Sequence, residues 1–113
     1  MKVYISMPIN GRDEITLAEK LDGARQRVEE LESLIRTKDK YKDAELISTF
    51  DSKVNAGFME QPECDVLARC IRAVLQCDVV FFDIGYLNSK GCMLEYYAAK
   101  IYGKKIILYG DLF

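Results

Sequence analysis

Short apolar runs alternate along the chain with longer stretches in which apolar residues recur every three or four positions. The short runs are rich in β-branched and aromatic residues, which is typical of strands, and they predict strands at residues 2–6, 44–49, 78–84 and 104–110. The order β-α-β-α-β-α-β predicts a doubly wound α/β fold, a flavodoxin-like three-layer sandwich with right-handed crossovers. We expect a parallel sheet of four to five strands in the order 2-1-3-4.

Three helices are predicted between the strands, each from one apolar stripe. The first covers residues 13–38, with the stripe Leu17, Leu21, Ala24, Val28, Leu31 and Ile35. The second begins at Pro62 and Glu63, and its stripe is Val66, Leu67, Cys70, Ile71 and Val74. The third runs from about Gly91 to Tyr102 and ends at Gly103; the side chains expected to face inward are Leu94, Tyr97, Ala98 and Ile101. Residues 50–62 show no period and predict a loop of a length that is often functional.

The chain has 113 residues, which predicts a single domain over 1–113. Its net charge is −2 and the charges are interspersed, so no basic face for a nucleic acid polymer stands out, and we expect small molecules or copies of the chain as partners. No apolar run approaches the roughly 20 residues of a membrane span, and the opening run is too short for a signal peptide. We therefore expect a cytoplasmic protein.

The four cysteines form no CxxC pair, and the chain contains no histidine. We expect reduced thiols that pack as small apolar groups, with no metal site and no cofactor. The lack of histidine excludes Ser-His and Cys-His nucleophile pairs. Acid–base chemistry would then fall to carboxylates, tyrosine, lysine or a thiol.

In a doubly wound sheet, ligands bind at the carboxyl ends of the strands where the strand order reverses. With the order 2-1-3-4, that crevice lies between residues 6–12 (SMPINGR) and residues 85–91 (GYLNSKG). Both loops open a helix, whose free N–H groups favour anions, and each carries small donors; these are Asn10, Ser89 and Gly91. The alternative is that Ser89 only caps its helix and that Gly11 and Gly91 only permit turns.

Four further side chains could contribute to this crevice. Glu95, in the second turn of the third helix, could project over the crevice mouth or be a solvated surface residue. Lys90 could neutralise a phosphate or simply be exposed. Asp83 follows the apolar third strand at its carboxyl end and is a site candidate, while Tyr4 lies in the first strand and could equally be part of the core.

Three segments together resemble the nucleoside 2-deoxyribosyltransferase superfamily, and most closely its small uncharacterised branch. They are KVYISMPINGR, LARCIRAVLQCDVVFF and NSKGCMLEYYAAKIYGKKIIL. The resemblance covers about two-thirds of the chain, and the last segment is its specific part. It implies N-glycosidic chemistry in which the residue matching Glu95 attacks the anomeric carbon of a nucleoside or nucleotide. The glycosyl group then passes to another base or to water, as in retaining glycosidases.

The resemblance also implies how the substrate is held. Members that act on free nucleosides have Asp six positions before the nucleophile, whereas the 2′-deoxynucleoside 5′-phosphate N-hydrolases have Ser, and this chain has Ser89. An Asp would repel a phosphate, so Ser89 with Lys90 favours a nucleoside 5′-monophosphate. The first loop, Asn10, Gly11 and Arg12, matches a phosphate-binding loop. Tyr4 matches a tyrosine near the nucleophile.

Two positions depart from the family pattern. Cys70 stands where the family has an Asp that contacts the base or donates a proton. A thiol of ordinary pKa is a poor general acid, so the glycosidase could be slow, could use Asp65 or Asp83 instead, or could be lost. Met7 stands where the branch commonly has Gly, and could narrow the crevice.

Three functions remain open from the sequence. The first is an N-glycosidase or deoxyribosyltransferase-like enzyme of nucleotide metabolism. The second is a catalytically silent module that binds or senses nucleotides, which Cys70 favours. The third is an interaction domain without a small ligand. Family members commonly form homodimers or larger homo-oligomers, and the aromatic end, residues 109–113 (YGDLF), is a plausible interface segment.

Overall fold

Four parallel strands form one sheet in the order β2-β1-β3-β4, as the sequence predicts. The computed structural model describes residues 1–9, 14–55 and 62–113, and of residues 14–20 it describes the backbone only. The strands are β1 (Lys2–Ser6), β2 (Glu45–Ser48), β3 (Val79–Phe82) and β4 (Lys105–Leu108). The predicted last strand stops earlier than expected, because Tyr109–Leu112 forms a 3₁₀ turn in which Asp111 accepts a hydrogen bond from the Leu108 backbone N–H (2.9 Å).

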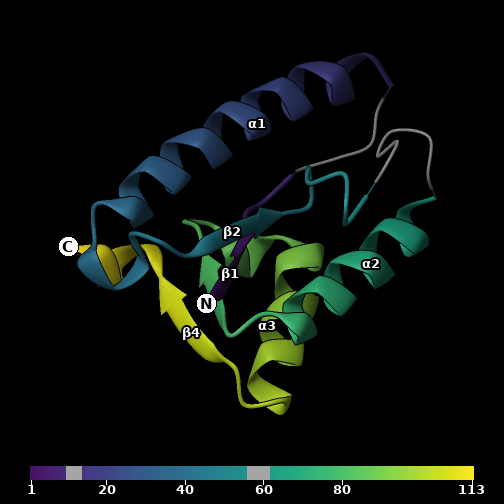
Figure 1. Cartoon of the computed structure of the whole chain (residues 1–113). Helices are drawn as coiled ribbons and strands as arrows, with labels where there is room; N and C mark the ends of the chain where they lie inside the picture. The colour runs from purple at the N-terminus through teal and green to yellow at the C-terminus, as the bar shows by residue number, and fades with distance from the viewer. Residues whose placement is uncertain (10–13, 56–61) are drawn as a thin grey trace.

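Helices cover both faces of this sheet, which confirms the flavodoxin-like three-layer arrangement. They are α1 (Glu14–Arg36), α2 (Glu63–Gln76) and α3 (Lys90–Ile101). Figure 1 shows α1 across one face of the sheet, and α2 and α3 together on the other. Because the connections leave β1 and β3 in opposite directions, the carboxyl ends of these two neighbouring strands border the switch point. None of the described helices is both long and apolar enough to cross a membrane.

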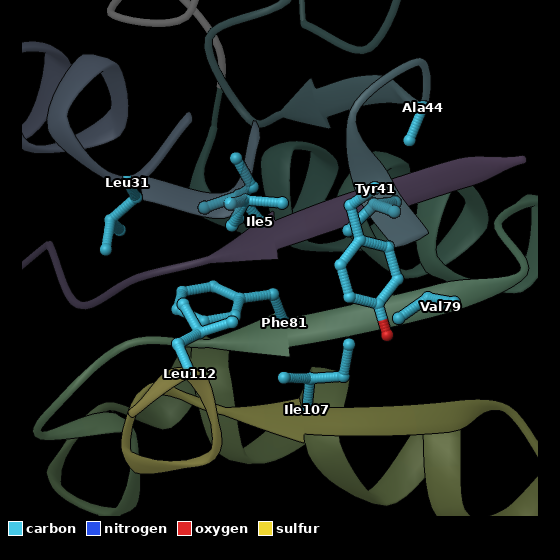
Figure 2. Packing of buried hydrophobic residues seen from close by; sticks show 10 residues of the cluster. Ile5, Leu31, Tyr41, Ala44, Val79, Phe81, Ile107 and Leu112 are labelled. Atoms are coloured by element: carbon cyan, nitrogen blue, oxygen red, sulfur yellow. The ribbon is translucent and has the colours of Figure 1, made fainter. Parts of the chain in front are cut away.

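The core has two parts, one on each face, because side chains alternate along each strand. The part toward α1 includes Ile5, Leu31, Phe81 and Ile107, which Figure 2 shows in close packing. The part toward α2 and α3 contains Tyr4, Val80, Phe82, Val66, Cys70, Ala73, Val74, Cys77 and Ala99. Tyr4 therefore lies on the face that α3 covers.

The stripes predicted for the first two helices are confirmed where the structure describes them. In α1 the buried residues are Leu21, Ala24, Val28, Leu31 and Ile35; the side chain of Leu17 is outside the described set. In α2, Val66, Cys70 and Val74 are buried, and Leu67 and Ile71 are half-buried. The loop predicted at 50–62 begins as a hydrogen-bonded turn through Asn55, and residues 56–61 are outside the description.

The predicted inward face of α3 is wrong. Leu94, Tyr97 and Ile101 are exposed and Ala98 is half-buried, whereas the buried residues are Cys92, Glu95 and Ala99. The reason is the close approach of α3 to α2: a Cβ at Gly91 would lie only 3.3 Å from Cδ2 of Leu67. Small side chains fit at such a contact and large ones do not. Because Glu95 lies on the same face of α3 as Cys92 and Ala99, its side chain also turns inward.

Gly103 ends α3 as predicted, with a positive φ of 66°. The N–H of the next residue, Lys104, donates to the carbonyl of Ala99 (2.9 Å), which is the usual glycine-terminated helix end. The segment predicted as an interface, residues 109–113, is only partly exposed. Leu112 is buried in the core toward α1, while Phe113 is exposed.

Candidate active site

Glu95 lies in the second turn of α3 and is buried, with 7% of its surface exposed. The helix starts at Lys90, and Ser89 is its N-cap: Oγ of Ser89 accepts a hydrogen bond from the backbone N–H of Cys92 (3.3 Å). Because the cap fixes the first turn, it also fixes the direction in which Glu95 points. The alternative that Glu95 is a solvated surface residue is therefore wrong.

Two hydroxyl groups of β1 lie beside the Glu95 carboxyl group. The hydroxyl of Tyr4, a residue that is only 1% exposed, lies beside the Glu95 carboxyl group and the Cys70 thiol. Ser6 is two residues further along β1, hence on the same face, and its hydroxyl also faces Glu95. The carboxyl end of β1 joins that of β3 here, because the backbone N–H of Asp83 donates to the carbonyl of Ser6 (3.0 Å).

Burial controls the protonation of Glu95. It raises the pKa of Glu95 from its ordinary value of 4.5 to about 8, although the Tyr4 and Ser6 hydroxyls act in the opposite direction. Glu95 is therefore mainly neutral at pH 7 when no ligand is bound. Burial, and then the nearby Glu95 charge, raise the pKa of Tyr4 well above 10, so Tyr4 remains a neutral donor.

A second set of polar side chains extends the site from Tyr4 toward the turn that follows β2. It consists of Thr49, Asn55 and Cys70. Oγ1 of Thr49 lies 3.1 Å from Sγ of Cys70, and Nδ2 of Asn55 lies 3.0 Å from Oγ1 of Thr49 and 3.4 Å from Sγ of Cys70. All three side chains are buried. Burial, and then the charge of Glu95, raise the pKa of the Cys70 thiol. Cys70 is thus a neutral hydrogen-bonded group beside Tyr4, and not a ready acid.

Three buried side-chain atoms in the described part of the chain lack a hydrogen bond of normal length and angle: Oγ of Ser6, Oδ1 of Asn55 and Oε2 of Glu95. All three belong to the cluster just described. An unpaired buried polar atom costs about 1–3 kcal/mol. Such a cost concentrated at the carboxyl edge of the sheet is typical of a site that a ligand completes.

Asp83 is buried at the end of β3, but its carboxylate is already paired. Arg27 of α1 donates from Nε to Oδ2 (2.9 Å) and from Nη2 to Oδ1 (2.8 Å), and its guanidinium also lies over the Tyr109 ring. This two-point ion pair joins α1 to the carboxyl end of β3. Because both oxygens of the Asp83 carboxylate already accept hydrogen bonds from Arg27, Asp83 is a poor substitute for a general acid.

The remaining predicted site residues have mixed positions. Lys90 is exposed at the start of α3, and Gly91 is half-buried where α3 meets α2. Ser89 is buried and caps α3, and its hydroxyl lies beside the thiol of Cys92. Asn10, Gly11 and Arg12 are outside the described residues. Asp65, named as a substitute acid, is exposed near the start of α2.

Comparison with known proteins gives the family of the chain. A family model described as a domain of unknown function, DUF4406, matches residues 1–108. The chain belongs to the DUF4406 family. None of the curated proteins compared with this DUF4406 sequence matches it.

The structure of this DUF4406 domain adds four residues that sequence reasoning missed: Ser6, Arg27, Thr49 and Asn55. Ser6 could have been found, since a polar residue two positions after Tyr4 lies on the same strand face. Arg27 is spaced three residues after Ala24 and four before Leu31, which places it at the edge of the inward stripe. Thr49 and Asn55 carry no sequence signal. Among the described residues, no three His, Cys, Asp or Glu side chains gather closely enough to hold a metal ion.

Proposed function

We propose that this DUF4406 protein cleaves or transfers the N-glycosidic bond of a nucleoside 5′-monophosphate or nucleoside, with Glu95 as the nucleophile. The observation that carries the proposal is the position of Glu95: a buried carboxyl group beside Tyr4, with Oε2 unpaired, at the carboxyl edge of the sheet. The resemblance to the nucleoside 2-deoxyribosyltransferase superfamily, strongest around Glu95, supports the same reaction.

In the proposed reaction Oε2 of ionised Glu95 attacks the anomeric carbon, C1′. The C1′–N bond breaks, and the base leaves with the bonding electrons and takes up a proton from solvent or a nearby donor. The glycosyl ester on Glu95 is then attacked at C1′ by water or by a second base, which restores the carboxylate. The Tyr4 hydroxyl donates a hydrogen bond that orients the carboxylate and favours its charge.

Ionisation of Glu95 is a necessary step, because a neutral carboxylic acid is a weak nucleophile. With a pKa of about 8, roughly a tenth of the free protein carries this charge at pH 7. Positive charge that develops on the sugar in the transition state favours the ionised form. We therefore expect kcat/KM to rise with pH up to about 8.

The 5′ end of the substrate would bind at the start of α3. Ser89 supplies a buried hydroxyl, and Lys90 a cation that is free to reach a phosphate from the surface. The backbone at Gly91 and the first loop, Asn10 to Arg12, are proposed to complete this contact. The paired carboxylate of Asp83 would act from further back by holding the end of β3 in place.

A second function, nucleotide binding without catalysis, is favoured by Cys70. This thiol occupies the place beside Tyr4 where an acid would be needed. It shares a hydrogen bond with the Thr49 hydroxyl, and burial raises its pKa. Such a module would use the same pocket to sense or store a nucleotide.

Base release separates the two functions. Purified protein is incubated with deoxy- and ribonucleoside 5′-monophosphates, free base is measured by chromatography, and binding is measured by thermal shift. We expect base release that Glu95→Gln abolishes and the exposed control Glu29→Gln preserves. Binding without base release supports the sensing module. Base release that is unchanged in Glu95→Gln contradicts Glu95 as nucleophile.

We also infer self-association and a cytoplasmic location. Within residues 84–102, the exposed large apolar side chains are Ile84, Leu87, Leu94, Tyr97, Ile101 and Tyr102, and such a surface is typical of an interface between copies. Sedimentation velocity at about 100 µM protein tests the inferred self-association. A monomer at that concentration would contradict it. The four cysteines are free and three are buried, which suits a reducing compartment.

A further inference from the structure

Asn55 has a feature that the proposed reaction does not use. Its side chain is 3% exposed, and its Oδ1 has no hydrogen bond among the described residues. The other two unpaired atoms, on Ser6 and Glu95, lie at the reacting end of the same cluster. Oδ1 of Asn55 is therefore a buried polar atom to which the proposed reaction assigns no partner.

The amide of Asn55 can adopt only one orientation. Nδ2 lies 3.3 Å from the backbone carbonyl oxygen of Thr49, an atom that can only accept, and 3.0 Å from Oγ1 of the same residue. Turning the amide over would place two oxygen atoms against each other. Because the donors of Nδ2 are used within the protein, Oδ1 is the atom that remains, and it can only accept a hydrogen bond.

The backbone around Asn55 is also held in place. The N–H of Asn55 donates to the carbonyl of Asp51 (2.9 Å), and the N–H of Asp51 donates to the carbonyl of Ser48 at the end of β2 (3.1 Å). The carboxylate of Asp51 in turn accepts from the N–H of Lys53 (2.9 Å). The acceptor is thus fixed before any ligand binds, which is what discrimination between ligands requires.

A series of pairwise contacts through the buried cluster begins at Asn55 and ends at Ser89, with Glu95 between them. From Asn55 the series continues through Cys70 and Tyr4 to Glu95. From Glu95 it continues through Ser6 and Cys92 to Ser89. If C1′ of a nucleotide lies at Glu95 and its 5′ end at Ser89, the group beyond C1′ toward Asn55 is the base.

We propose that Asn55 selects the base, and that its Oδ1 accepts a hydrogen bond from an exocyclic amino group. The inference rests on the proposed function for the identity of the ligand as a nucleotide. It adds that the site prefers a base with an amino group, such as adenine or cytosine, over the matching base with an oxo group, hypoxanthine or uracil. An oxo group would face Oδ1 with a second acceptor and leave both without a partner.

The test compares nucleotides that differ in this exocyclic group and in the proton that the adjacent ring nitrogen carries when the group is oxo. The 2′-deoxy 5′-monophosphates of adenine and hypoxanthine, and of cytosine and uracil, are titrated in thermal shift and assayed for base release. One good hydrogen bond gives about tenfold discrimination. We expect the wild type to favour the amino member of at least one pair by about tenfold or more, in Kd or in kcat/KM.

The variant Asn55→Ala should reduce that ratio to within about threefold, since the selecting atom is gone. Gln26→Ala removes an amide that is exposed on α1 and should keep the wild-type ratio. The wild-type ratio needs no variant, so the inference can be judged even if Asn55→Ala folds poorly.

The outcomes separate the inference from the function on which it rests. Nucleotide binding or base release without an amino preference overturns the role of Asn55 alone, and so does a preference that persists in folded Asn55→Ala. Neither binding nor base release with any of the four nucleotides overturns the proposed function, and the base selection with it.

Discussion

Replacing Glu95 by glutamine removes a buried acid whose protonation is coupled to folding. Glutamine has nearly the same shape and stays neutral at every pH. Burial raises the pKa of Glu95 from 4.5 to about 8 in the folded protein, while the unfolded chain keeps the ordinary value. Between these two values the folded state binds a proton that the unfolded state has released, so the free energy of unfolding falls as the pH rises.

The size of this effect follows from the two pKa values. Each pH unit between them is worth about 1.4 kcal/mol. From pH 5 to pH 8 the contribution of Glu95 falls by about 3 kcal/mol, because the titration is already under way at pH 5 and half complete at pH 8. The chain has no histidine, so no imidazole titrates in this window. Glu32, whose pKa burial also raises, is present in both proteins and cancels in the difference.

Urea unfolding at pH 5, 6, 7 and 8 measures the effect directly. The free energy of unfolding of the wild type should fall by about 3 kcal/mol relative to Glu95→Gln across this range. The exposed variant Glu29→Gln serves as the control and should follow the wild type. A difference between wild type and Glu95→Gln that is constant with pH would refute the reasoning, since it would mean that Glu95 has an ordinary pKa.

Three further variants test other contacts. Arg27→Ala leaves the buried carboxylate at the end of β3 unpaired, and should lower the free energy of unfolding in urea by about 2 kcal/mol. Gly103→Ala forces a side chain onto a backbone with φ of 66°, and should cost about 1 kcal/mol in the same assay. Tyr4→Phe removes a hydroxyl that lowers the pKa of Glu95, so the midpoint of the pH dependence of stability should move above 8.

Each of these three predictions has a control variant or an outcome that would contradict it. Arg72→Ala, exposed on α2, should change stability by less than about 0.5 kcal/mol, and an equal loss in both arginine variants would contradict a special role for Arg27. Gly23→Ala lies inside α1 with open space around its Cβ, so it should stabilise by up to about 1 kcal/mol. If Gly103→Ala and Gly23→Ala change the free energy of unfolding in the same direction, backbone strain at Gly103 is not the cause of the change. An unchanged midpoint in Tyr4→Phe would mean that the hydroxyl does not contact the ionised carboxylate.

The order of elements and the strand order were predictable because they depend on patterns that are local in sequence. Strand and helix periods identify the elements, and the right-handed preference of β-α-β connections leaves few ways to order a parallel sheet. The stripes of α1 and α2 were also predictable, since each has one clear apolar face. Gly103 was predictable as well, because few residues other than glycine accept its backbone conformation.

The orientation of α3 was not predictable, because the helix has two competing stripes. Its larger apolar residues, including Leu94 and Tyr97, suggest one face, whereas the close contact with α2 selects the face of Cys92 and Ala99. The burial of Glu95 follows from that choice. Helix periodicity counts hydrophobicity, and it does not measure how near a neighbouring helix lies.

The partners of the site residues depend on contacts between distant parts of the chain. Asp83 was recognised as a residue at the end of a strand, but its partner Arg27 is 56 positions away in sequence. Asn55 reaches Cys70 across 15 positions, from a segment that shows no sequence period. Such pairs appear only when the fold brings the segments together.

The most direct test of Glu95 as nucleophile is mass spectrometry of the covalent intermediate. The protein is mixed with a 2′-fluoro nucleoside 5′-monophosphate, whose glycosyl ester hydrolyses slowly, and is quenched in acid and digested with trypsin. Cleavage after Lys90 and Lys100 gives a peptide, residues 91–100, in which Glu95 is the single carboxylate side chain. We predict that this peptide gains the mass of the sugar phosphate in the wild type but not in Glu95→Gln. An unmodified peptide in a sample that has released base would contradict the assignment.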